Sequence, residues 1–269
     1  MSIITISRGS YSKGREIAEK AAERLGYGCI GRRVLLEASE EFNIPEVKLR
    51  RAIHDAPSVL ERFAYGKEKY IAYIQSALLK NLKQDNVVYH GLAGHFFLKG
   101  VSHVLKVRII ADMEDRVKHE MEREGISRED ALEMLKKDDE QRVKWSKYLY
   151  GIDTRDPSLY DLVIHIHKIT VEDAADIICD TVKLDHFKTT PESQKKMESL
   201  ALAAEVKAAL VDLKPDIDVS ADPDGTVTVQ TRAPESREKS LIREMQEIAG
   251  RIPGVRDFKV EVRLTDIVE

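Results

Sequence analysis

The chain has 269 residues, which allows one large domain or two of ordinary size. Its net charge of −4 and pI of about 6.1 argue against a nucleic-acid binder, which would carry a basic excess, and no apolar run is long enough to span a bilayer. Cys29 and Cys179 make neither a disulfide framework nor a metal site, and the N-terminus has no signal-peptide pattern, so we expect a cytoplasmic protein.

The N-terminal segment predicts a strand, a loop and a helix in succession. Residues 2–7 are rich in Ile and Thr, which favours a β-strand. A loop containing Gly9 and Gly14 follows. Residues 16–25 carry apolar side chains on one helical face, and Gly26 stands where a C-cap glycine is expected.

Further strands and helices alternate along the next part of the chain. Apolar residues recur at helical spacing throughout residues 33–85. Three more strands are predicted at residues 86–90, 103–110 and 162–166, with helices after the last two. This alternation predicts an α/β domain over residues 1–186, in which a parallel sheet is covered by helices on both faces.

Helix-capping patterns mark where three of these helices begin. Asp112 with Asp115, Ser127 with Asp130, and Thr170 with Asp173 all place an acid three residues after an N-cap residue. Gly125 is expected to end the first of the three helices.

The C-terminal part has a different pattern. Residues 187–196 are polar and contain a proline, so they are predicted to be a linker. Residues 197–269 follow the order helix, strand, strand, helix, strand, an α+β unit. Its last strand alternates apolar and charged residues, which predicts one buried and one solvated face.

The spacing of Gly9 and Gly14 is that of a phosphate-binding Walker A loop. In such a loop successive backbone N–H groups turn inward to hold phosphate oxygens, and the following helix N-terminus adds partial positive charge. The position that usually carries Lys is Arg15, and the position that usually carries Ser or Thr is Glu16. The loop with Gly9 and Gly14 lies between a predicted strand and a predicted helix, which is the context that a Walker A loop requires.

Several segments resemble the cytidylate kinase-like family. The resemblance begins with Ile-Ser-Arg at 6–8 and Gly-Arg-Glu-Ile-Ala at 14–18, and it continues in the same order through Asp-Glu-Gln-Arg at 139–142 and Tyr-Asp-Leu-Val at 160–163. It implies a P-loop NTPase-type phosphotransferase that binds ATP and a nucleoside monophosphate and has a mobile, arginine-bearing lid. CMP is the acceptor implied by the family.

The resemblance also implies site residues. Arg15 would hold the donor phosphates with Arg8 nearby, Arg116, Arg123 and Arg142 would line the lid, and Asp139 would orient Arg142 or a water bound to the metal. Glu16 would bind Mg²⁺. The implied catalytic residues are Arg15, Arg116, Asp139 and Arg142. The implied cofactor-binding residues are Arg8, Gly9, Ser10, Tyr11, Ser12, Lys13, Gly14, Arg15 and Glu16. Read singly, the lid arginines and Asp139 fit solvated helix faces better than a site, and Glu16 also fits a first-turn acid that complements the helix dipole.

Some positions depart from the family pattern. Tyr11 and Lys13 replace usual glycines, and Leu92 stands where the family has an arginine. His90 ends a strand, where a ligand contact and a structural role are both open. His165 and His167 share one face of a strand, but the sequence offers no third metal ligand beside them.

Residues 197–264 resemble the BON domain, on the pattern Ala-Glu-Val-Lys-Ala-Ala-Leu at 204–210, the strand at 224–229 and Ile-Pro-Gly-Val at 252–255. For this domain a ligand- or partner-binding regulatory role and a role in homo-oligomerisation both stay open.

Two functions are therefore weighed for the whole chain. The first is an ATP-dependent nucleoside-monophosphate kinase, and the second is a nucleotide-binding regulatory protein with little or no transfer activity.

Overall fold

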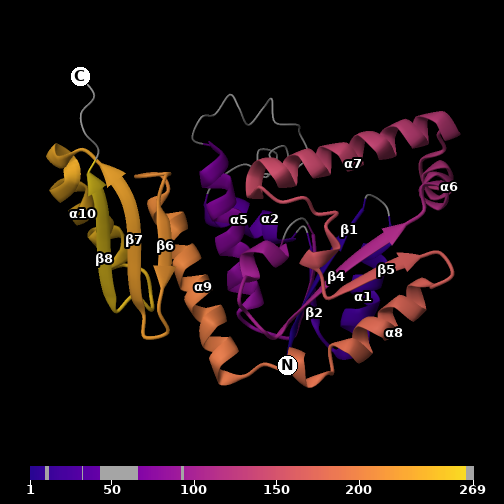
Figure 1. The fold of residues 1–269 in the computed structure, drawn as a ribbon, viewed down its shortest axis with the longest axis horizontal. Helices are drawn as coiled ribbons and strands as arrows, with labels where there is room; N and C mark the ends of the chain where they lie inside the picture. The colour runs from indigo at the N-terminus through magenta and orange to yellow at the C-terminus, as the bar shows by residue number, and fades with distance from the viewer. Residues whose placement is uncertain (10–11, 32, 43–65, 92–93, 265–269) are drawn as a thin grey trace.

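The computed structural model describes residues 1–9, 12–31, 33–42, 66–91 and 94–264 (Figure 1). Its larger part is built on a five-stranded sheet with the order β2-β3-β1-β4-β5, in which all neighbouring strands are parallel. The strands are β1 (Ile3–Arg8), β2 (Gly28–Ile30), β3 (Val87–His90), β4 (Val104–Ala111) and β5 (Leu162–Ile166). The predicted parallel α/β sheet is confirmed, although the short strand β2 was not predicted.

Alternation along the central strand divides the core between the two faces of the sheet. Ile4 and Ile6 point to the face covered by α1 (Gly14–Leu25) and α8 (Val171–Thr181). Ile3 points to the opposite face, where it packs with α2 (Arg33–Glu41) and α5 (Gly66–Leu82). Because both faces are covered, the inner strands are apolar on both sides. Part of the predicted helical region, residues 43–65, lies outside the described residues.

A pair of helices, α6 (Met113–Glu124) and α7 (Arg128–Tyr150), connects β4 to β5 (Figure 1). The two helices pack on each other through a small apolar cluster of Val117, Ala131 and Leu135. A 3-10 turn, η2 (Pro157–Leu159), leads from α7 into β5, and another, η1 (Gly94–Leu98), precedes β4.

Two of the three predicted helix caps form. The Ser127 side chain accepts a hydrogen bond from the Asp130 N–H, and Thr170 with Asp173 makes a complete capping box. Asp112 is the N-cap of α6, so the predicted start of this helix is confirmed, but its side chain does not make the predicted capping hydrogen bond. Its carboxylate and that of Asp115 instead face two histidines. Gly26 and Gly125 end α1 and α6 as predicted.

The C-terminal part has its own sheet and its own core. Helix α9 (Pro191–Leu210) is followed by β6 (Asp218–Ala221), β7 (Thr226–Ala233), α10 (Glu235–Ala249) and β8 (Asp257–Leu264). The three strands form one mixed sheet in which β7 pairs antiparallel with β6 and parallel with β8. A Cβ on Gly225 would lie 2.6 Å from the Gly254 carbonyl oxygen, so the turns before β7 and before β8 can approach closely only with glycine there.

Helix α9 packs against both parts of the molecule, as Figure 1 shows beside α5. Met197, Ala201 and Ala204 belong to the core under α5, whereas Val206 and Leu210 belong to the core of the small sheet. The helix begins at Pro191, capped by Thr190, and not near Met197 as predicted. Residues 191–196 of the predicted linker are therefore helical. Among the described residues no helix has the length and apolar character needed to cross a membrane.

Candidate functional site

The loop after β1 lies at the carboxyl end of the central strand, where parallel α/β sheets bind ligands. The Gly9 N–H donates to the carbonyl of Ile109 on β4 at 3.3 Å, which fixes where the loop begins. The buried Ser12 hydroxyl lies 3.2 Å from the carbonyl oxygens of both Gly9 and Ile109, so it closes the loop onto β4. Ser10 and Tyr11 lie outside the described residues.

The end of the loop is shaped by Lys13, Gly14 and Arg8. Lys13, which precedes α1, has a φ of 60° and lies in the left-handed region. A Cβ on Gly14 would lie 2.8 Å from Cδ of Arg8, so the Arg8 stem packs directly over the first residue of α1. Glycine is required at position 14 for this contact. Arg8 is thereby held beside the N-terminus of the helix that follows the loop.

Arg116 lies on the other side of the loop. Its side chain is 8% exposed, and Nη1 forms an ion pair with Oδ2 of Asp139 at 2.8 Å. A Cβ on Gly9 would lie 4.0 Å from the same Nη1 atom, so the guanidinium borders the loop. Its Nε and Nη2 atoms are buried and have no hydrogen-bond partner among the described residues. Leaving buried donors unpaired costs about 1–3 kcal/mol each, so an acceptor placed at these two atoms would offset that cost.

The next two residues of the implied site, Arg15 and Glu16, follow Gly14 on α1. Both are exposed on the first turn of α1. The Arg15 side chain is 69% exposed, and its Nε lies 2.8 Å from Oε1 of Glu19 on the next turn. That hydrogen bond raises the pKa of the arginine. In this conformation the Arg15 guanidinium is engaged along α1, whereas the Arg116 guanidinium borders the loop.

The other arginines that the resemblance assigns to a lid lie along the two packed helices α6 and α7. Arg123 pairs with Glu120 at 2.7 Å and with Glu124 at 2.8 Å, all on its own helix. Glu120 is fully buried, and this burial raises the pKa of its carboxyl group. Arg142 is half-buried one turn after Asp139 on α7, so both lie on the same helix face. Arg116 and Asp139 are thus in contact beside the loop, while Arg123 is engaged by acids of its own helix.

A network of polar side chains near the loop was not predicted from the sequence. The hydroxyl of Tyr160, before β5, donates to the Thr154 carbonyl at 2.9 Å and lies 3.2 Å from the Ser7 hydroxyl. Arg108 of β4 lies over the Tyr160 ring, 5.6 Å from its centroid. The signal in the sequence was an arginine in the middle of an apolar strand. This network joins the end of β1 to the segment that leaves α7.

His90 ends β3 next to the loop, where its ring packs against Gly31. Burial and the positive charges of Arg8 and Arg15 lower its pKa to about 4. The imidazole is therefore neutral near neutral pH, and it adds no positive charge to the site. This environment favours the structural role over a charged phosphate contact.

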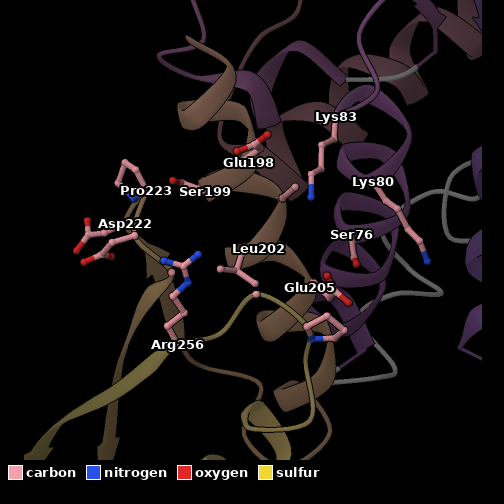
Figure 2. Close-up of a pocket in the computed structure, with 15 residues that line it drawn as sticks. Ser76, Lys80, Lys83, Glu198, Ser199, Leu202, Glu205, Asp222, Pro223 and Arg256 are labelled. Atoms are coloured by element: carbon pink, nitrogen blue, oxygen red, sulfur yellow. The ribbon is translucent and has the colours of Figure 1, made fainter. Parts of the chain in front are cut away.

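A cavity of about 380 Å³ lies elsewhere, between α5, α9 and the turns of the small sheet (Figure 2). Lysines from α5 and from the turn after it, acids from α9, and Asp222 with Arg256 from the small-sheet turns line it. Charges of both signs are mixed along its wall, so no single ligand charge is favoured. It contains none of the residues of the loop site.

The parallel sheet, with a glycine-containing loop and a helix after its central strand, is consistent with a P-loop kinase fold. The chain belongs to the cytidylate kinase-like family, whose family model matches residues 3–168. The C-terminal unit lies beyond that match.

Curated relatives agree with this assignment. A cytidylate kinase of Sulfolobus acidocaldarius is 29% identical over 55% of this chain and 76% of its own length. One of Pyrococcus horikoshii is 32% identical, but the match spans only 43% of this chain and 58% of that protein. One of Ignicoccus hospitalis is 27% identical over 61% of this chain and 90% of its own length.

A solved structure shares the fold. An uncharacterised protein from Eubacterium ventriosum superposes with a TM-score of 0.52 and 22% identity, covering 68% of this chain and 98% of its own.

Proposed function

We propose that the protein transfers the γ-phosphoryl group of ATP to a nucleoside monophosphate, with CMP as the first acceptor to test. Membership of the cytidylate kinase-like family supports the reaction class, and the curated cytidylate kinases support the choice of CMP.

The buried guanidinium of Arg116 carries the proposal. It borders the loop at Gly9, Asp139 fixes its orientation, and two of its donor atoms have no partner among the described residues. Phosphoryl transfer needs positioned positive charge more than covalent chemistry from the protein. A planar guanidinium can give two parallel hydrogen bonds to phosphate oxygens, which a lysine ammonium cannot.

The proposed reaction divides the work among the loop, the lid and the metal. Loop N–H groups, the start of α1, Arg8 and Lys13 would hold the donor phosphates, and Arg116 would bind the transferring group. An acceptor phosphate oxygen forms the new bond to the γ-phosphorus, the bond to the bridging oxygen breaks, and ADP leaves with that electron pair. Mg²⁺, which the family implies, would neutralise phosphate charge, with Glu16 as its proposed protein contact.

The test is ADP release from ATP with each of the four ribonucleoside monophosphates. We expect release with one of them, and a fall of about 100-fold or more in kcat/KM for Arg116→Ala. Arg128→Ala is the matched control, because Arg128 forms a surface ion pair with Glu114 and should leave the rate unchanged. No release with any monophosphate would refute the kinase proposal.

One observation favours the second candidate, a nucleotide-binding regulatory protein with little transfer activity. Arg15 occupies the position of the usual loop lysine, yet it is bonded to Glu19. In this case a BON-like C-terminal domain would sense a ligand or partner, or hold two copies together. Binding of ATP by calorimetry without any ADP release would support this candidate over the first.

A further inference from the structure

Two carboxylates and two imidazoles meet at the outer edge of the parallel sheet. Asp112 follows β4 directly, and Asp115 lies one turn into α6. His165 and His167 share one face at the end of β5, the edge strand. Because β4 and β5 pair with Ala111 opposite Ile166, the next residues, Asp112 and His167, also lie side by side.

Three of these side chains bring one possible ligand atom each close together. Nδ1 of His167 lies 3.1 Å from Oδ2 of Asp115 and 3.5 Å from Oδ2 of Asp112, and the three ligand atoms lie within 4.8 Å of one another. Zinc bonds of about 2.0–2.1 Å in a tetrahedron place neighbouring ligand atoms about 3.3 Å apart. The two histidine–aspartate separations therefore already lie close to the edges of such a tetrahedron.

The fourth side chain supports one of the ligands. Nε2 of His165 lies 3.1 Å from Oδ1 of Asp112, the oxygen that does not face His167. Hydrogen-bonded partners of this kind orient carboxylate ligands. An N-cap aspartate usually accepts a capping hydrogen bond, but the Asp112 side chain makes none. Its carboxylate instead contacts the two histidines.

We propose that Asp112, Asp115 and His167 bind a divalent transition metal of the Zn²⁺ class, with His165 as the residue that positions Asp112. Three protein ligands leave one position for water, as in open zinc sites. An imidazole ligand favours Zn²⁺ over Mg²⁺, which prefers oxygen ligands. The bound ion would tie the first turn of α6 to the end of β5. Arg116 follows Asp115 on that same turn, so this link would also fix the position of the helix that carries Arg116.

The experiment is calorimetric titration of the full-length, tag-free chain with Zn²⁺, without nucleotide, and with Mg²⁺ in parallel. We expect one Zn²⁺ per chain, a raised melting temperature with Zn²⁺, and no comparable effect of Mg²⁺. Substitution by Co²⁺ should give the intense visible absorption of four-coordinate cobalt. His167→Gln and Asp115→Asn should abolish binding, whereas His165→Gln should weaken it about 10- to 100-fold.

His186→Gln is the matched control, because His186 is an exposed histidine on the 3-10 turn η3 (Asp185–Phe187), away from the cluster. It should bind Zn²⁺ as the unaltered chain does. Circular dichroism checks that each variant is folded, which we expect because all four side chains are exposed. No Zn²⁺ binding, equal binding in His167→Gln, or equal affinity for Mg²⁺ would overturn the proposal.

Discussion

Nη1 of Arg116 lies 2.8 Å from Oδ2 of Asp139, and this ion pair joins the first turn of α6 to the middle of α7. The arginine is buried and the aspartate is one-third exposed, so the pair is only partly screened by water. Asp139 thus both compensates a buried charge and fixes the direction of the remaining guanidinium donors.

Asp139→Asn should therefore lower both activity and stability. Loss of one charged hydrogen bond is worth about 1.5–3 kcal/mol, which corresponds to a fall of roughly 10- to 100-fold in kcat/KM. Urea unfolding should show a loss of about 1–3 kcal/mol, because Arg116 stays buried without its partner. Glu114→Gln removes the exposed pair with Arg128 and should change stability by no more than about 0.5 kcal/mol. Equal behaviour of the two variants would contradict the role of Asp139.

Lys13 has a strained backbone conformation and a positively charged side chain, and two variants distinguish the effect of the strain on stability from the effect of the charge on ATP binding. At its φ of 60° a residue with a Cβ costs about 1–2 kcal/mol, so Lys13→Gly should unfold at higher urea concentration than Lys13→Ala. Both variants lose the ammonium group, so both should weaken ATP binding, and by less at high salt. Lys20→Ala, which removes the ion pair of α1 with Glu172 of α8, is the control for general charge effects. Unchanged ATP affinity in both Lys13 variants would remove Lys13 from the site.

The sequence was sufficient for the strands of the parallel sheet other than the short β2, and for the αββαβ order of the C-terminal part, because local patterns specify these features. Alternation of apolar and charged residues placed β8, Gly26 placed the end of α1, and Ser127 with Asp130 placed the start of α7. It did not locate the start of α9, because residues 191–196 are polar and only tertiary packing of Met197 shows that the helix is continuous there.

The side-chain partners were harder to predict than the elements. Asp139 was expected to orient Arg142 or a metal-bound water, but the residues around it in the sequence do not indicate its ion pair with Arg116 on another helix. His165 and His167 lacked a third ligand in the sequence, since Asp112 and Asp115 approach them only through the pairing of β4 with β5. Contacts between elements distant in the chain depend on the assembled sheet, which periodicity alone does not specify.

The core under α5 should depend on a residue that belongs to the C-terminal segment. Met197 is completely buried among residues of the larger part, so Met197→Ala should cost about 2–5 kcal/mol in urea unfolding. Lys195→Ala, exposed on the same helix, should change stability by about 0.5 kcal/mol at most.

By the same reasoning, a chain cut at residue 190 should expose the apolar side of α5 and aggregate. A soluble, fully stable truncated chain would show that α9 is dispensable for the larger core.

Glu120 gives the α6–α7 pair a dependence on pH. Burial raises the pKa of its carboxyl in the folded state above the ordinary 4.5 of the unfolded state. At a pH between the unfolded-state pKa and the folded-state pKa, the folded state therefore binds more protons than the unfolded state. Stability must then fall as pH rises through this window, and the loss is complete above the folded pKa. Glu120→Gln, which cannot ionise, should lack this fall, so its stability relative to the unaltered chain should improve as pH rises from about 4.5 toward neutral. Urea unfolding at a series of pH values measures this difference, with the exposed Glu122→Gln as control. A difference that stays constant with pH would mean that the Arg123 ion pair fully offsets the burial of Glu120.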